Sequence, residues 1–195
     1  IRKNGKLAPC SWDEAFNTIR KKIAKTDPSE IAALAGDLVD QESQLALRML
    51  LDAMGVKNRD CRTDGAMIPY DHRSNYLFNS TINNIENADV VLLVGCNPRH
   101  EATMVNARLR KAVKQNNCTI GLIGEQVNLA YPYQFLSDDP SVLSEITKGS
   151  HPFSKVLKSA KNPLLILGTS CFLNANSTSI LHQTNELHKK FSVQV

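Results

Sequence analysis

The sequence predicts an α/β fold whose sheet is doubly wound and mainly parallel. The main observation is a pattern that recurs four times: a short run of mostly Val, Ile, Leu and Ala, without polar alternation, that is closed by a glycine. Such runs are typical of strands buried on both faces. Helical patterns separate them, so we expect right-handed, Rossmann-like βα units. The four runs with their glycines are 31–36, 90–95, 118–124 and 164–168.

The run 90–94 is the clearest of these strands and marks the place of a candidate ligand site. Gly95 ends it in a turn, and Pro98 prevents the strand from continuing. The apolar residues beyond His100 recur at the spacing of one helix face: Ala102, Val105, Leu109 and Ala112. Ligands of such sheets lie beyond the carboxyl ends of the strands. The candidate cofactor-binding residues are therefore Gly95, Asn97, Pro98 and Arg99.

The N-terminal region contains clear local signals. Asn4 and Gly5 predict a hairpin turn. Ser11 predicts a capping box, in which its hydroxyl accepts the backbone N–H of Glu14 and the Glu14 carboxylate accepts the N–H of Ser11. The helix that follows stops before Pro28. After the strand at 31–35, a helix that is apolar on most sides ends at a glycine, so we expect it to be buried against a sheet and a neighbour.

Between 56 and 88 the pattern is lost and Asn and Asp are frequent, which is typical of a functional segment or an interface. Asp64 with Gly65, and the cluster at 71–73, are suited to lining a pocket. The alternative is a hydrogen-bonded surface loop with a short helix around 73–78. Later segments predict an irregular crossing at 125–140 and three helices, at 141–147, 151–160 and from about 176 to 191.

Composition narrows the possible partners. The 195 residues are 42% hydrophobic and 22% charged, which is ordinary for a globular protein. The net charge of +4 is mild, and no aromatic residues are interleaved with the basic ones, so we expect no nucleic-acid partner. No apolar run approaches the roughly 20 residues of a transmembrane helix, so we expect no direct membrane insertion. The first residues lack an initiator Met and a signal peptide, so we expect a piece of a longer protein.

The sequence lacks the motifs typical of catalytic, nucleotide-binding and metal-binding sites. The five cysteines are scattered without a CxxC pair, which favours a reducing compartment and argues against an iron–sulfur cluster held within this segment. There is no phosphate loop, three-glycine dinucleotide fingerprint or Gly-x-Ser-x-Gly elbow. His182 and His188 lack a second ligand at helical spacing. We therefore predict no catalytic residue and no metal site.

With these residues in view, the chain resembles the molybdopterin oxidoreductases, whose domain is also called formate dehydrogenase-like. Residues 1–15 resemble the family's entry segment, and 88–98 resemble its nucleotide loop. Within that superfamily the chain resembles the large iron–sulfur subunit of respiratory complex I, the NADH:quinone oxidoreductase. The segments that carry this likeness are 73–77, 97–99, 106–108 and 149–154, and matches run in order from residue 1 to about 168.

This resemblance implies that NADH is oxidised on a partner flavin subunit and that electrons then pass along iron–sulfur clusters. Several of these 2Fe–2S and 4Fe–4S clusters would lie in a part of the subunit N-terminal to this segment, so no cofactor is assigned to these residues. The implied partners are the other subunits of the peripheral arm of complex I. The implied location is the cytoplasmic side of the bacterial inner membrane or the matrix side of the mitochondrial one.

The molybdenum enzymes of the family hold a guanine-dinucleotide form of molybdopterin, and two departures count against it here. Their metal ligand stands in the stretch that matches 61–69, where Cys61 is the only thiol and falls early. After the third strand they commonly carry an acidic-Pro-Arg turn, whereas this chain has Gly-Glu-Gln-Val at 124–127. Without those groups a pyrophosphate loses bonds worth about 1.5–3 kcal/mol each. The four residues at 95 and 97–99 are therefore expected to be a vestigial site.

Three hypotheses follow. The first is a non-catalytic structural domain at 1–150, with 151–195 beginning a further βα region of the same fold and with 56–88 and 131–140 as contact surfaces. The second is a functional molybdopterin-guanine-dinucleotide oxidoreductase fragment that uses Cys61 as metal ligand. The third is a nucleotide-binding module with Arg99 on a phosphate.

Overall fold

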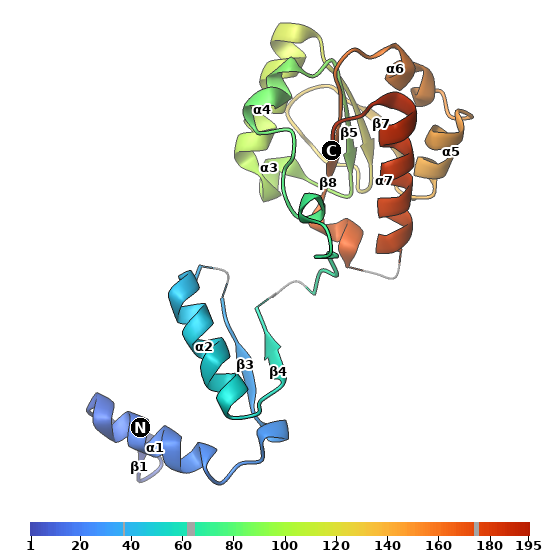
Figure 1. The fold of residues 1–195 in the computed structure, drawn as a ribbon. Helices are drawn as coiled ribbons and strands as arrows, with labels where there is room; N and C mark the ends of the chain where they lie inside the picture. Colours follow the sequence, from blue (N-terminus) through green and yellow to red (C-terminus); the bar gives the residue numbers. More distant parts are fainter. Residues whose placement is uncertain (37, 62–64, 174–175) are drawn as a thin grey trace. The chain divides into compact units, whose positions relative to one another are not determined.

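The computed structural model describes residues 1–36, 38–61, 65–173 and 176–195. The chain forms two compact units, Ile1–Asp64 and Gly65–Val195, which we call the first and the second unit and describe separately (Figure 1). Asp64, part of the predicted polar cluster, lies outside the described residues. The elements that follow residue 150 pack within the second unit, and the predicted domain boundary at that residue stays a prediction.

The second unit is built on a four-stranded parallel sheet with the order β7-β6-β5-β8. The predicted strands at 90–94, 118–123 and 164–167 are confirmed as β5 (Val90–Val94), β6 (Thr119–Ile123) and β8 (Pro163–Leu167). The fourth strand, β7 (Gln134–Ser137), lies in the segment 125–140, where we expected an irregular crossing. That expectation is therefore wrong for residues 134–137. β7 is a short edge strand whose side chains are exposed or half-buried, so no continuous apolar run announces it.

Helices cover both faces of this sheet, because successive strand residues point to opposite sides. Val91, Leu93 and Ile120 pack on α4 (Thr103–Asn116) through Leu109 and Ala112. The other face packs on α5 (Val142–Lys148), α6 (Phe153–Ser159) and α7 (Ser177–Phe191) (Figure 1). The predicted α/β fold with a parallel sheet is thereby confirmed. None of the helices in the described ranges is both long and apolar enough to cross a bilayer.

Between residues 65 and 89 the chain forms two short 3₁₀ turns. The first, Arg73–Asn75, is shorter than the helix that we expected around 73–78. The second, Asn83–Asn87, is fastened to α4 because the Glu86 carboxylate pairs with Arg108 and with Lys111, whose Nζ lies 2.6 Å away. Hydrogen bonds from these two cations hold the pKa of Glu86 below its usual value.

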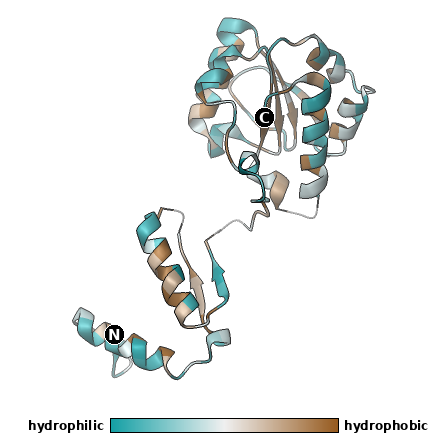
Figure 2. Ribbon diagram, viewed as in Figure 1, coloured by the Kyte–Doolittle hydropathy of each residue, from teal (hydrophilic) through white to brown (hydrophobic). Residues whose placement is uncertain are grey.

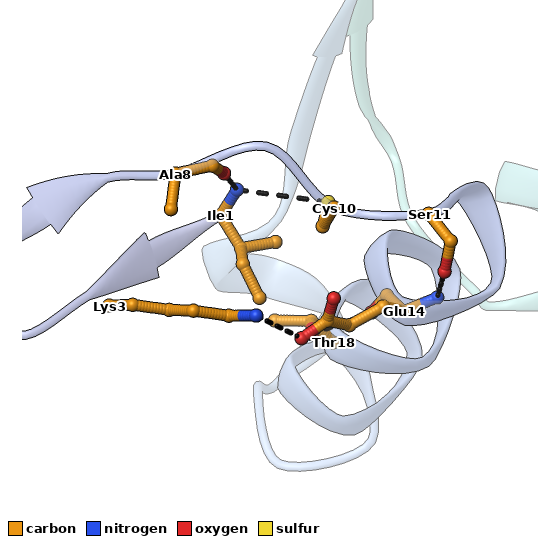
Figure 3. Close-up of polar contacts among 7 residues, drawn as sticks. All are labelled: Ile1, Lys3, Ala8, Cys10, Ser11, Glu14 and Thr18. Atoms are coloured by element: carbon orange, nitrogen blue, oxygen red, sulfur yellow. Dashed lines mark hydrogen bonds and ion pairs between the residues drawn. The ribbon is translucent and has the colours of Figure 1, made fainter.

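The first unit begins with the predicted hairpin, β1 (Arg2–Lys3) and β2 (Lys6–Leu7), which leads into α1 (Trp12–Ile23). The Ser11 hydroxyl accepts the N–H of Glu14 at 3.2 Å, as predicted (Figure 3). The reciprocal bond is not formed: the Glu14 carboxylate instead pairs with Lys3 Nζ at 2.9 Å (Figure 3). The cationic partner supplied by the hairpin therefore replaces the backbone N–H of the capping box.

The rest of the first unit consists of a 3₁₀ turn at Pro28–Glu30, β3 (Ala32–Leu34), α2 (Gln41–Ala53) and β4 (Asn58–Asp60). β3 pairs in parallel with β4, not with the main sheet as we expected. β4 is Asn-Arg-Asp and has no apolar signal, so sequence analysis missed it. α2 carries many hydrophobic residues, drawn in brown in Figure 2. It departs from expectation because Leu51 alone is buried on it, while Met49 and Leu50 are more than half exposed.

Candidate functional site

Two glycines, Gly95 after β5 and Gly168 after β8, meet at the carboxyl edge of the main sheet. Gly95 has a φ of +59°, which favours glycine, and its N–H donates to the Ile123 carbonyl at 2.8 Å. Gly168, at the end of β8, donates to the Val94 carbonyl at 2.8 Å. A Cβ on Gly168 would come within 2.0 Å of the Gly95 carbonyl oxygen. The missing side chain at 168 thus allows the turns after β5 and β8 to approach closely.

The space above Gly95 is filled by the chain itself. After β8 the chain enters a 3₁₀ turn, Thr169–Phe172. A Cβ on Gly95 would lie 2.6 Å from both Ser170 Oγ and Cys171 Sγ. The Ser170 hydroxyl donates to the Gly95 carbonyl, and the Cys171 thiol donates to the Val94 carbonyl at 3.3 Å. The missing side chain at 95 therefore makes room for this turn, in the place where a ligand would approach the backbone.

The polar groups of Asn97 and Arg99, which follow Gly95, also form hydrogen bonds within the protein. The N–H of Asn97 donates to Glu101 Oε1 at 2.8 Å, so a carboxylate already occupies the start of α3 (Pro98–Glu101). Arg99 Nη1 donates to the Asn128 carbonyl at 3.0 Å, and this bond links α3 to the loop after β6. Asn97 Oδ1 is buried and has no hydrogen-bond partner among the described residues. Because solvent does not reach this oxygen, a ligand atom would contact it only after the surrounding atoms move.

Two cysteines and a tyrosine next to the turn are held in their neutral forms. Burial, together with the nearby Glu101 and Cys171, raises the pKa of Cys96 to about 12. Burial also raises the pKa of Cys171 to about 11 and raises that of Tyr131, whose hydroxyl donates to Asn106 Oδ1 at 2.9 Å. A thiol with such a pKa stays protonated at neutral pH, so neither cysteine is activated as a thiolate nucleophile.

Cys61 lies in the first unit, directly after β4, and is exposed. Its N–H donates to Asp60 Oδ1 at 2.8 Å, and it borders a cavity of about 230 Å³ between α2 and the β3–β4 pair. Within the described ranges, no three His, Cys, Asp or Glu side chains are grouped so as to hold a metal ion. In the predicted polar cluster, Asn75 Nδ2 donates to Asp71 Oδ1 at 3.0 Å, while His72 and Arg73 are exposed.

Sequence reasoning missed four residues that decide the chemistry of the turn: Glu101, Asn128, Ser170 and Cys171. Glu101 could have been found, because it stands four residues after Asn97 at a helix start, where a carboxylate can reach back to a free N–H. The other three come from distant parts of the chain and carry no local signal.

The residues of this turn do not fit the pyrophosphate of a molybdopterin dinucleotide. Such a group needs close backbone approach, free N–H donors and a cation. Here Ser170 and Cys171 cover the glycine, Glu101 takes the Asn97 N–H and places a negative charge beside it, and Arg99 is engaged by a carbonyl. The glycine, the N–H and the cation thus each contact another part of the protein.

Comparison with known proteins gives consistent matches. A family model described as molybdopterin oxidoreductase matches residues 1–194. The chain is 38% identical over 97% of its length to NADH dehydrogenase (ubiquinone) iron-sulfur protein 1, mitochondrial, of Solanum tuberosum. It is 37% identical over 99% of its length to the G subunit of NADH-quinone oxidoreductase from Rickettsia felis, and 35% identical over 99% to that from Rickettsia prowazekii.

The chain spans only 26% of the length of the Solanum protein and 29% of each of these two Rickettsia proteins. The family model and the relatives each match nearly the whole of this chain. The predicted likeness to the large iron–sulfur subunit is therefore confirmed, and the chain belongs to the molybdopterin oxidoreductase family.

Proposed function

We propose that this chain is a non-catalytic structural domain of the large iron–sulfur subunit of NADH–quinone oxidoreductase, respiratory complex I. In this role it supports electron transfer from NADH to quinone, which is carried by 2Fe–2S and 4Fe–4S clusters elsewhere in the subunit. Its sheet is then a doubly wound, Rossmann-like unit retained from a cofactor-binding ancestor. It packs against other subunits of the peripheral arm, at the cytoplasmic face of a bacterial inner membrane or the matrix face of a mitochondrial one.

The observation that supports this proposal is that the groups of the turn after β5 contact other segments of the same chain. In a cofactor site, the glycine, the helix start and the cation face the ligand. In this chain, Gly95 faces Ser170 and Cys171, and Arg99 holds the Asn128 carbonyl. These contacts join β5 to the segments after β8 and β6. They stabilise the edge of the sheet at the place where the molybdenum enzymes bind their cofactor.

The first test is the cofactor content of the purified chain. Elemental analysis and the visible and near-ultraviolet absorbance are expected to show no stoichiometric molybdenum, iron or pterin. Calorimetric titration with guanine and adenine nucleotides, up to millimolar concentration, is expected to give no heat of binding. Stoichiometric molybdenum or iron, or saturable nucleotide binding that Arg99→Ala abolishes, would refute the proposal.

The second test separates a structural domain from a functional molybdopterin oxidoreductase fragment. Cys61→Ala in the full-length subunit is expected to leave NADH–quinone turnover and assembly unchanged. Cys10→Ala is the matched control, because Cys10 is the other exposed thiol of the first unit. Loss of turnover in the Cys61 variant alone, with assembly intact, would favour the enzyme hypothesis.

A further inference from the structure

Asn4 and Gly5 form the turn of the β1–β2 hairpin and are the only Asn-Gly pair in the sequence. Asn4 is exposed, and Gly5 borders open space, because a Cβ built on it would meet no atom within 4 Å. Within the described ranges, neither the Asn4 side chain nor the Gly5 N–H forms a hydrogen bond. The side-chain amide carbon of Asn4 and the backbone nitrogen of Gly5 are therefore both free at this turn.

These two neighbouring atoms can react with each other. The Gly5 nitrogen, after its proton passes to hydroxide, attacks Cγ of Asn4; a C–N bond forms, the Cγ–Nδ2 bond breaks, and ammonia leaves with a proton taken from water. The product is a cyclic succinimide. Water then opens the ring at either carbonyl and leaves an aspartate or an isoaspartate at position 4. The whole sequence consumes one water and releases one ammonia, so solvent is the only other reactant.

The hairpin favours this reaction in three ways. Glycine at the second position leaves the attacking nitrogen unhindered by a Cβ. The two strands have two residues each, all of them exposed, and a hairpin without further strands is marginally stable, so the backbone at Asn4 has freedom to bring the atoms together. Arg2 Nη1 donates to the Gly5 carbonyl at 3.1 Å, which places a cation beside the residue whose nitrogen becomes negative.

Asn79 provides a contrast within the same chain. It is also exposed and is followed by a small residue, Ser80. Its Nδ2, however, donates to the carbonyls of Ser74 and Leu77 at 3.0 and 3.1 Å, and Ser80 is only 8% exposed. These contacts hold the side-chain amide in place, whereas the amide of Asn4 is unrestrained.

We propose that Asn4 is a site of spontaneous deamidation, through cyclisation with Gly5, and that the modification releases the hairpin from α1. An isoaspartate adds one carbon to the backbone, so the two-residue turn no longer sets the register of β1 and β2. That register places Lys3 at the Glu14 carboxylate, which is 2.9 Å from its Nζ (Figure 3). The inference goes beyond the proposed function, because neither a cofactor nor a partner subunit takes part.

The test is incubation of the 195-residue chain at physiological temperature and mildly alkaline pH. Peptide mass spectrometry that distinguishes aspartate from isoaspartate follows each Asn. We expect Asn4 to be modified before any other Asn and to give both products, while Asn79 stays intact until denaturant is added. An Asn4 that reacts in denaturant but stays intact in the folded chain would overturn the proposal. So would aspartate as the sole product, because direct hydrolysis then replaces cyclisation.

A pair of variants identifies the attacking nitrogen. Alanine at Gly5, with a φ of +79°, is strained and loosens the turn, yet its methyl group hinders the nitrogen. We expect Gly5→Ala to lose most of the isoaspartate that the unmodified chain forms in the same time. Gly55→Ala is the matched control, because Gly55 also has a positive φ and open space, and it should leave the rate at Asn4 unchanged. Equal rates in Gly5→Ala and the unmodified chain would contradict cyclisation.

The purified isoaspartate form tests the structural consequence. We expect faster amide hydrogen exchange in residues 2–7 than in the unmodified chain, because the register of the hairpin is lost. Unchanged exchange in these residues would contradict release of the hairpin.

Discussion

The two units of this chain use the same kinds of elements but bury them to different extents. In the second unit all five residues of β5 are buried, and helices cover both faces of the parallel sheet. In the first unit the parallel pair β3–β4 has exposed or half-exposed side chains, and α1 has no buried residue. Trp12 and Phe16, stacked on each other on α1, are 77% and 60% exposed.

This difference shows that an apolar pattern predicts an element more securely than it predicts burial. A parallel strand pair is normally covered on both faces, and two strands alone are marginally stable. The second unit meets this need by itself: its cores on the two faces of the sheet are made from its own helices. Of the residues that the structure describes in the first unit, only Leu51 and Val56 are buried apolar residues. Five predictions test how far this contrast extends.

The largest expected effect is on thiol reactivity. Cys10 and Cys61 of the first unit are exposed, whereas burial raises the pKa of Cys96 and Cys118 of the second unit to about 12. A thiol reagent at slightly alkaline pH should modify the exposed pair more than about a thousandfold faster, because only the thiolate reacts. Mass spectrometry of partly labelled protein measures the rates. In denaturant all sites should react alike; unequal rates there would mean that burial is not the cause.

The next largest difference between the two units is expected when one leucine of each is replaced by alanine. Leu93 is 0% exposed and Leu50 is 53% exposed. We expect Leu93→Ala to lower the free energy of unfolding by about 4 kcal/mol, through lost burial and the cavity left behind. Leu50→Ala should change it by no more than about 0.5 kcal/mol. Urea unfolding of both variants provides the measurement. Equal costs would mean that Leu50 is covered in solution and would remove the contrast.

A glycine pair gives the third comparison. In Gly168→Ala the new Cβ meets the Gly95 carbonyl at 2.0 Å, so backbone must move and we expect a loss of about 3 kcal/mol. In Gly36→Ala the nearest atom is Val39 Cγ2 at 4.0 Å, and the change should be within about 0.5 kcal/mol. Denaturant midpoints of the two variants decide. A tolerated alanine at 168 would show that the turns at this edge are not closely packed.

Asp89 should make the stability of the second unit depend on pH. Burial alone would raise its pKa, but the N–H groups of Lys161 and Asn162, at 2.6 and 2.9 Å, outweigh this and hold the pKa below 3.8. The stabilisation is therefore complete above the unfolded-state pKa and is lost as pH falls through the folded-state value. Asp89→Ala should cost about 2 kcal/mol at neutral pH and less near about pH 3. Asp89→Asn, which cannot ionise, is the control; the same pH slope in that variant would assign the effect to another group.

The smallest effect is expected in the first unit. Ser11→Ala removes the hydroxyl that accepts the Glu14 N–H and should destabilise α1 by about 1 kcal/mol. Amide hydrogen exchange of α1 measures this destabilisation directly. Ser11→Asp should restore protection because Asp also caps helices. Because no residue of α1 is buried, we expect exchange in the second unit to stay unchanged. A change there would show that the two units are coupled.

Local signals were enough to predict most elements. Uninterrupted apolar runs predicted β5, β6 and β8, and three-to-four spacing predicted α4 and α7. β4 and β7 were missed because their residues are polar or half-exposed, and their pairing depends on strands elsewhere in the chain. At the candidate site, the position of the turn was predictable, but its covering by Ser170 and Cys171 was not, because they join it from 75 or more residues away.

The α/β class with its Gly-ended strands, and the family, could be recognised from the amino-acid sequence, because both depend on short-range patterns of size, polarity and backbone freedom. The pairing of the strands into sheets, and the filling of the turn at Gly95 by the protein's own atoms, became apparent from the folded chain. Those outcomes depend on contacts between distant segments, where hydrogen bonds from Ser170 and Arg99 satisfy groups that a local pattern leaves open.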